Sequence, residues 1–130
     1  MINNFNQMKL TTTLLIFSLI LNSYSQETDC SNFRIGTFRY NHPDFKNWKI
    51  VRTKTKQTET DTQKKIVIES TIEWISDCEY ELTYTNINQP ESNSMIGKKI
   101  KVSIIKSSKN KIYCHTSSVH GEIDLEMVKI

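Results

Sequence analysis

The sequence has no alanine and only 3 Gly and 2 Pro among its 130 residues. Alanine is the strongest helix former, so its absence beside frequent Ile, Thr, Tyr, Phe and Val disfavours a mainly helical protein. The low Gly and Pro content excludes collagen-like and low-complexity chains. A chain of this length forms at most one ordinary domain, which also excludes a large multidomain protein.

An excess of one sign of charge is also absent. The sequence has 17 basic and 14 acidic residues, for a formal net charge of +3. Nucleic-acid-binding domains concentrate a much larger positive charge on one face. The composition therefore predicts no nucleic-acid partner.

Long hydrophobic runs are scarce, and the clearest one lies near the N-terminus. Lys9 precedes the apolar run at residues 14–21, and Ser23 and Ser25 follow it. One positive charge, a short apolar core and small residues before the cut are typical of a secretory signal peptide. The run is too short to cross a hydrocarbon core of about 30 Å. We therefore expect a signal peptide at residues 1–25, a single domain at residues 26–130, no membrane span, and export to the periplasm or outside the cell.

The remaining sequence alternates between apolar and polar residues with the period of two that strands require. No long segment has helical periodicity. The pattern predicts about eight short strands, at residues 34–40, 48–52, 56–60, 65–75, 79–87, 98–106 and 111–117 and from Gly121 onward. Short connections favour an all-β antiparallel meander that closes into a barrel, because closure removes exposed strand edges.

Two hairpin registers follow from the requirement that apolar faces coincide. A hairpin centred on Asp77 pairs Trp74 with Tyr80, Ile72 with Leu82 and Ser70 with Tyr84. A hairpin centred on Ser108 pairs Ile104 with Ile112 and Val102 with Cys114.

The three cysteines, Cys30, Cys78 and Cys114, allow one disulfide and leave one thiol. In an alternating meander, Cys30 lies at the same barrel end as Cys78, which predicts a Cys30–Cys78 disulfide with Cys114 as a buried thiol. If residues 48–60 formed one strand instead of two, Cys78 would lie at the opposite end. His115 and His120 lack the spacing of a zinc site, so no metal is predicted.

Two segments resemble a family of short exported bacterial proteins that has no established function. They are residues 30–40 (CSNFRIGTFRY) and residues 72–80 (IEWISDCEY). Some members carry the label of a DNA topoisomerase IV, but residues 26–130 are too few for its ATP-binding fold or cleavage core. More loosely, Gly36-Thr37-Phe38 resembles the G-x-W opening of lipocalin-like barrels, with Phe in place of Trp. This resemblance implies a lipocalin-like barrel and no particular function.

Catalytic motifs are absent from the sequence. It has no G-x-S-x-G nucleophile elbow, and Cys114 and His115 are strand neighbours whose side chains point to opposite faces. Glu73 and Glu81 oppose each other on the expected outer face, where water surrounds them. The sequence therefore predicts a non-enzymatic protein with no catalytic residue and no cofactor.

Polar residues near one end of the expected barrel form the candidate ligand site. The predicted ligand-binding residues are Trp48, Arg52, Gln57, Glu59 and Tyr84. A competing interpretation makes Arg52 and Glu59 a cross-strand surface ion pair worth less than about 1 kcal/mol.

Two functions compete for such a barrel. The first is a monomeric binder of a small apolar or amphipathic ligand, with a cavity of about 300 Å³ or more and Arg52 or Gln57 at its mouth. The second is a secreted inhibitor of extracytoplasmic proteases. That protein would have a filled core and would make its contact through residues 88–94 or the mature N-terminus.

Overall fold

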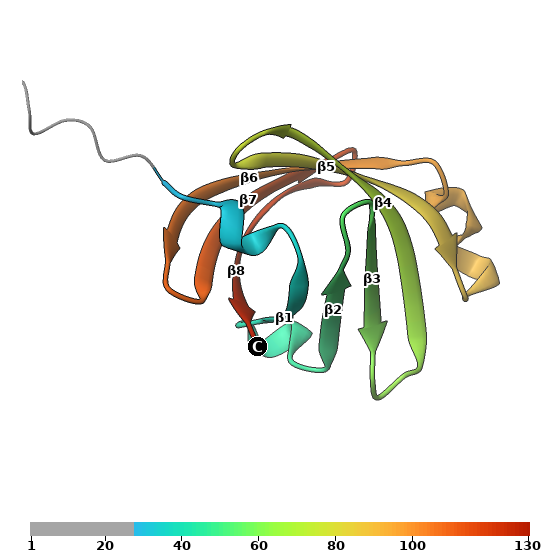
Figure 1. Cartoon of the computed structure of the whole chain (residues 1–130). Helices are drawn as coiled ribbons and strands as arrows, with labels where there is room; N and C mark the ends of the chain where they lie inside the picture. Colours follow the sequence, from blue (N-terminus) through green and yellow to red (C-terminus); the bar gives the residue numbers. More distant parts are fainter. Residues whose placement is uncertain (1–27) are drawn as a thin grey trace, which may run out of the picture.

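The computed structural model describes residues 28–130, so the predicted signal peptide and its cleavage site lie outside the described residues. The strands form a closed barrel in sequence order, in which β8 pairs antiparallel with β1 (Figure 1). They are β1 (Gly36–Tyr40), β2 (Trp48–Arg52), β3 (Lys56–Asp61), β4 (Ile66–Ser76), β5 (Glu79–Ile87), β6 (Lys99–Ser108), β7 (Lys111–Ser118) and β8 (Gly121–Lys129). This confirms the predicted all-β antiparallel barrel, including the division of residues 48–60 into two strands.

In residues 28–130, three short 3₁₀ helices accompany the strands: η2 (Ser31–Phe33), η3 (Pro43–Phe45) and η4 (Pro90–Met95). Helix η2 precedes β1, η3 lies in the β1–β2 connection, and η4 lies in the β5–β6 connection, which projects to one side in Figure 1. In the part of the chain that is described, no helix is long and apolar enough to cross a membrane.

The hairpin of β4 and β5 has the predicted register. Trp74 lies opposite Tyr80, Ile72 opposite Leu82 and Ser70 opposite Tyr84. The same register puts Glu73 opposite Glu81 on the other face, where Lys99 Nζ lies 3.0 Å from Glu81 Oε1. The inward residues Ile72, Tyr80 and Leu82 belong to the buried core.

The predicted register of the β6–β7 hairpin is wrong. Ile104 lies opposite Cys114, and Val102 lies opposite Thr116. A register shift between Ile104 and Lys106 leaves Ile105 as an extra residue, and its side chain is 63% exposed. Such a bulge changes which residues face each other while the side chains before and after it stay buried. Ile104 and Ile112 are accordingly both buried although they are not partners.

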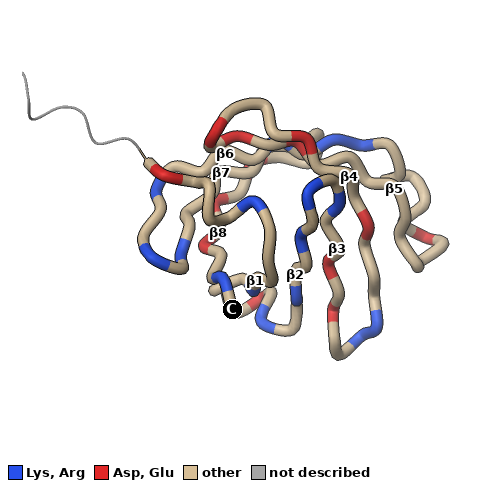
Figure 2. Tube along the Cα trace, viewed as in Figure 1, with Lys and Arg blue, Asp and Glu red and all other residues tan. Residues whose placement is uncertain are grey.

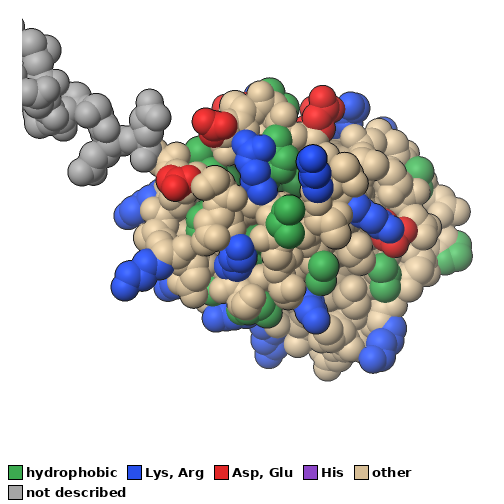
Figure 3. Space-filling model, in the orientation of Figure 1, with side chains coloured by type: hydrophobic (Ala, Val, Ile, Leu, Met, Phe, Trp, Pro, Cys, Tyr) green, Lys and Arg blue, Asp and Glu red, His purple; other side chains and the backbone are tan. Residues whose placement is uncertain are grey.

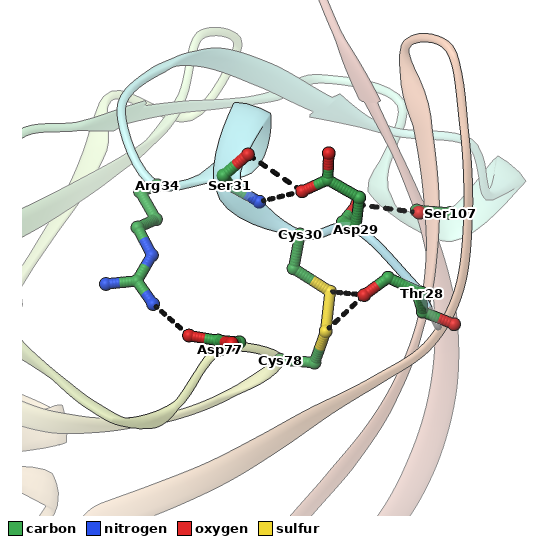
Figure 4. The surroundings of a disulfide bond; sticks show 8 residues. All are labelled: Thr28, Asp29, Cys30, Ser31, Arg34, Asp77, Cys78 and Ser107. Carbon is green, nitrogen blue, oxygen red and sulfur yellow. Dashed lines mark hydrogen bonds and ion pairs between the residues drawn. A yellow bond between two sulfur atoms is a disulfide. The ribbon is translucent and has the colours of Figure 1, made fainter. Parts of the chain in front are cut away.

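One end of the barrel is covered by the segment that leads into β1. Cys30 and Cys78 form the predicted disulfide, and Cys114 is a buried free thiol. Arg34 Nη2 lies 3.5 Å from Asp77 Oδ1, and the Ser107 hydroxyl donates to the Asp29 carbonyl at 2.8 Å (Figure 4). These contacts hold the segment over the barrel, with Phe33 buried beneath it. We call this the closed end.

The outer surface carries charges of both signs. Basic residues lie at the β3–β4 and β6–β7 turns, and acidic residues occur along several strands (Figure 2). On the face in Figure 3, basic and hydrophobic side chains are spread over the surface, whereas the acidic side chains lie in its upper part.

Candidate functional site

Two adjoining cavities lie between the side chains at the barrel end opposite the disulfide. The inner cavity, of about 170 Å³, is lined by Tyr40, Gln57, Glu59, Tyr80, Leu82, Tyr84, Ile100, Val102, Cys114, Thr116, Leu125 and Met127. The outer cavity, of about 160 Å³, is lined by Tyr40, Phe45, Trp48, Glu59, Ile68, Tyr84 and Leu125. The two share Tyr40, Glu59, Tyr84 and Leu125, so one set of side chains borders both.

Among residues 28–130, Glu59 is the only carboxylate that lines either cavity. It points inward because inward and outward residues alternate along β3, where Gln57, Glu59 and Asp61 are all buried. The Glu59 side chain is 9% exposed, and its Oε1 accepts a hydrogen bond from the Tyr40 hydroxyl. Burial raises the pKa of Glu59, against the opposing effects of the Tyr40 hydrogen bond and the Arg52 charge.

The phenol groups beside Glu59 keep their protons. Burial raises the pKa of Tyr40 well above its ordinary value, and the negative charge of Glu59 adds to this effect. Burial also raises the pKa of Tyr84 to about 12, again with a contribution from Glu59. Both hydroxyls are therefore hydrogen-bond donors at neutral pH.

Arg52 lies at the closed end, which corrects the prediction that it sits at the mouth. Its side chain is 1% exposed and lines neither cavity. Nη1 donates to the Phe33 carbonyl at 2.7 Å, while Nε and Nη2 donate to Gln57 Oε1 at 2.9 and 2.8 Å. Nη2 also donates to the Tyr80 hydroxyl at 2.9 Å.

The alternative surface ion pair between Arg52 and Glu59 is also wrong. Arg52 lies opposite Gln57 in the β2–β3 ladder, and Glu59 lies opposite Ile50. The Arg52 guanidinium packs over aromatic rings, 4.9 Å from the Phe38 centroid and 4.5 Å from the Tyr80 centroid. Arg52 is thus a buried structural cation that joins the covering segment to the barrel wall.

The other four predicted ligand-binding residues border the cavities. Gln57 lines the inner cavity, although its carbonyl oxygen is occupied by Arg52. Trp48 lines the outer cavity, while Glu59 and Tyr84 line both. The structure thus brings Trp48, Glu59 and Tyr84 together and leaves Arg52 apart from them.

Sequence reasoning missed Tyr40 and Phe45 as cavity residues. Alternation along residues 34–40 puts Tyr40 on the same face as Phe38, so the sequence pattern contains a signal for its inward position. Phe45 belongs to η3, where no strand alternation operates. Its ring centroid lies 5.7 Å from that of Tyr40, a contact that only the folded connection creates.

The Cys114 thiol and the His115 imidazole lie on opposite faces of β7. Burial raises the pKa of the Cys114 thiol to about 12. Its neighbour His115 lies on the other face of β7, where Nδ1 is 2.6 Å from Asp124 Oδ1. No group of three or more His, Cys, Asp or Glu side chains within residues 28–130 is arranged to hold a metal ion.

Within residues 28–130, fold and cavities together define a small closed β-barrel whose two cavities are lined by apolar and aromatic side chains and by one carboxylate, that of Glu59. Comparison of the chain with protein families, with curated proteins and with solved structures finds no match.

Proposed function

We propose that the protein is an exported, non-enzymatic, lipocalin-like barrel that binds a small amphipathic molecule in the two adjoining cavities. The observation that carries this proposal is the buried Glu59 carboxylate within a space lined mainly by apolar and aromatic side chains. A few polar groups in a largely apolar cavity are the usual composition of a small-molecule site.

The size of the cavities limits the ligand. Each is smaller than the roughly 300 Å³ at which typical ligand pockets begin. Because they share four lining residues, a ligand that occupies both would approach that lower limit. We therefore expect a molecule with a single ring or a short chain.

Export is supported by the Cys30–Cys78 disulfide, since disulfides persist mainly in oxidising compartments. This chemistry is compatible with the periplasm and with the cell exterior. The resemblance of residues 30–40 and 72–80 to short exported bacterial proteins agrees with it.

The alternative function is inhibition of an extracytoplasmic protease. The β5–β6 connection supports it, because η4 gives this exposed loop a regular turn that a protease could contact. An inhibitor needs no internal cavity, so a barrel with a filled interior would favour this alternative. The two cavities therefore weaken it.

Native mass spectrometry of protein purified from its own host tests the proposal. A retained small molecule that is lost from a Leu125→Phe variant supports binding in the barrel, because Leu125 borders both cavities. Val51→Phe is the matched control, since Val51 is an exposed apolar residue on the outer face of β2, between the inward Ile50 and Arg52. A co-purifying protease and no retained molecule would favour the inhibitor instead.

A further inference from the structure

The Glu59 carboxylate is not directly paired with a cation among residues 28–130, although the charge of the buried Arg52 acts on it. Among residues 28–130, no Lys, Arg or His forms an ion pair with it. The nearby buried cation, Arg52, makes its hydrogen bonds to Phe33, Gln57 and Tyr80. Because burial of an unpaired charge is costly, a ligand that brings a positive charge to Glu59 gains more than a neutral one.

The side chains around Glu59 also favour a cation. The outer cavity presents the rings of Tyr40, Phe45, Trp48 and Tyr84 beside the carboxylate. Aromatic faces attract cations electrostatically, and this attraction grows where water is excluded. Glu59 and these rings therefore select for the same sign of charge.

An anionic ligand has no corresponding partner in the cavities. Of the residues that the structure describes, no lysine, arginine or histidine lines either cavity. Asp61 is buried near this end of β3, and its Oδ1 accepts hydrogen bonds from the backbone of Gln63 and Lys64 at 3.0 Å. The negative charge of Glu59 would repel a ligand carboxylate or phosphate.

We propose that the ligand is an amphipathic amine whose protonated ammonium pairs with Glu59 and whose apolar part lies among the aromatic rings of the outer cavity. This inference rests on the proposed function, because it identifies the ligand class of the same cavities. An ammonium has three N–H donors, one of which can reach the carboxylate while another meets a phenol oxygen.

Three ligands of similar size distinguish the contribution of ligand charge to affinity from the contribution of apolar burial. Isothermal titration calorimetry at neutral pH compares 2-phenylethylamine, 2-phenylethanol and phenylacetate, which are cationic, neutral and anionic. We expect the amine to bind at least about tenfold more tightly than the alcohol, in line with a charge-assisted hydrogen bond, and phenylacetate to bind most weakly.

The Glu59→Gln variant removes the charge and keeps a carbonyl oxygen for the Tyr40 hydroxyl. We expect it to bind the alcohol as the unchanged protein does and to lose the preference for the amine. Glu73→Gln, altered on the exposed outer face of β4, is the matched control and should keep the preference.

A second variant covers the case in which Glu59→Gln does not fold. Phe45 lies in η3, outside the strand ladder, so Phe45→Leu leaves every strand intact. Loss of one aromatic face should weaken amine binding by about two- to fivefold and affect the alcohol less.

The outcomes separate the two proposals. Equal affinity of the unchanged protein for amine and alcohol overturns the amine inference and leaves the binding function in place. If none of the three probes binds and no small molecule is retained by the native protein, the proposed function itself is overturned. Tight binding of phenylacetate contradicts the ligand class directly.

Discussion

At the scale of single residues, two side chains of the barrel interior, Arg52 and Glu59, carry opposite charges and are stabilised differently. Arg52 donates hydrogen bonds to three residues, whereas Glu59 receives one from Tyr40 and borders open space. Complete hydrogen bonding makes a buried charge a structural element. A buried charge that also faces a cavity is available to a ligand.

Replacement of Arg52 by Met should destabilise the fold strongly. The Phe33 carbonyl and Gln57 Oε1 would lose their donors while they remain buried, at a cost of about 3 kcal/mol in the free energy of unfolding. Urea unfolding followed by circular dichroism measures this loss. Arg39→Met, on the exposed side of β1, should change the unfolding free energy by less than about 0.5 kcal/mol, and an equal loss in both variants would contradict a structural role for Arg52.

Glu59 should make stability fall as pH rises. Burial raises its pKa in the folded protein, so the folded state binds the proton more tightly than the unfolded state. Its stabilising contribution is fully present below the unfolded pKa, near 4.5, and is lost as pH rises through the folded pKa.

The unfolding free energy of the Glu59→Gln variant, minus that of the unchanged protein, should therefore increase as the pH is raised from 4 to 8. Urea unfolding of both proteins at a series of pH values measures the difference. Glu73→Gln on the outer face is the control. A difference that stays constant or shrinks as pH rises would show that the folded protein does not raise the Glu59 pKa.

At the scale of elements, the β6–β7 hairpin joins its strands through a two-residue turn. Lys109 has φ of 41°, a left-handed conformation in which side chains are strained. A glycine adopts this conformation without the steric cost.

We expect Lys109→Gly to raise the free energy of unfolding by about 0.5–1 kcal/mol. Thermal and urea unfolding measure the gain. Ser108→Gly, one position earlier and within β6, should instead lower stability, because glycine is disfavoured inside a strand. A lower unfolding free energy in both variants would contradict this expectation. It would mean that the extra conformational freedom glycine gives the unfolded chain outweighs the strain it relieves at Lys109.

The β4–β5 and β6–β7 hairpins together show how far the sequence predicts strand positions and strand register. Strand positions followed from alternation, and the β4–β5 register followed because one register alone kept apolar residues on one face. The β6–β7 register could not be predicted from alternation, because Ile104 and Ile105 are consecutive apolar residues and either side chain could face inward. Packing around Ile104 places the bulge at Ile105.

At the scale of the whole molecule, the disulfide fixes the covering segment over the closed end. It joins residues 48 positions apart and so restricts a long loop of the unfolded chain. The segment also contributes the Phe33 carbonyl to Arg52, which couples the disulfide to the buried cation.

The double variant Cys30→Ser/Cys78→Ser should lose about 2–4 kcal/mol of unfolding free energy. Reduction of the unchanged protein with dithiothreitol should lower its stability to the same level and leave the double variant unaffected. Equal urea midpoints with and without reductant would contradict this role of the disulfide.

The candidate site was predictable in part. Inward positions on residues 48–60 identified Trp48, Gln57 and Glu59, because alternation assigns each strand residue to a face. Alternation does not determine depth along the barrel axis, so Arg52 was expected at the mouth and lies at the closed end. Phe45 reaches the cavity from a connection, where neither a strand nor a helix repeat applies.

The sequence by itself determined the all-β class and the order and approximate number of the strands, because these depend on the period of apolar residues. It predicted the Cys30–Cys78 pairing on the condition that residues 48–60 form two strands, which the tertiary structure decided. Only the tertiary structure decided which buried polar groups are satisfied and which face empty space. That distinction depends on how side chains from different strands fill the interior, and no single strand contains this information. Arg52 and Glu59 lie seven residues apart on inward positions of neighbouring strands, and the packing around them gives one a structural role and exposes the other to the cavities.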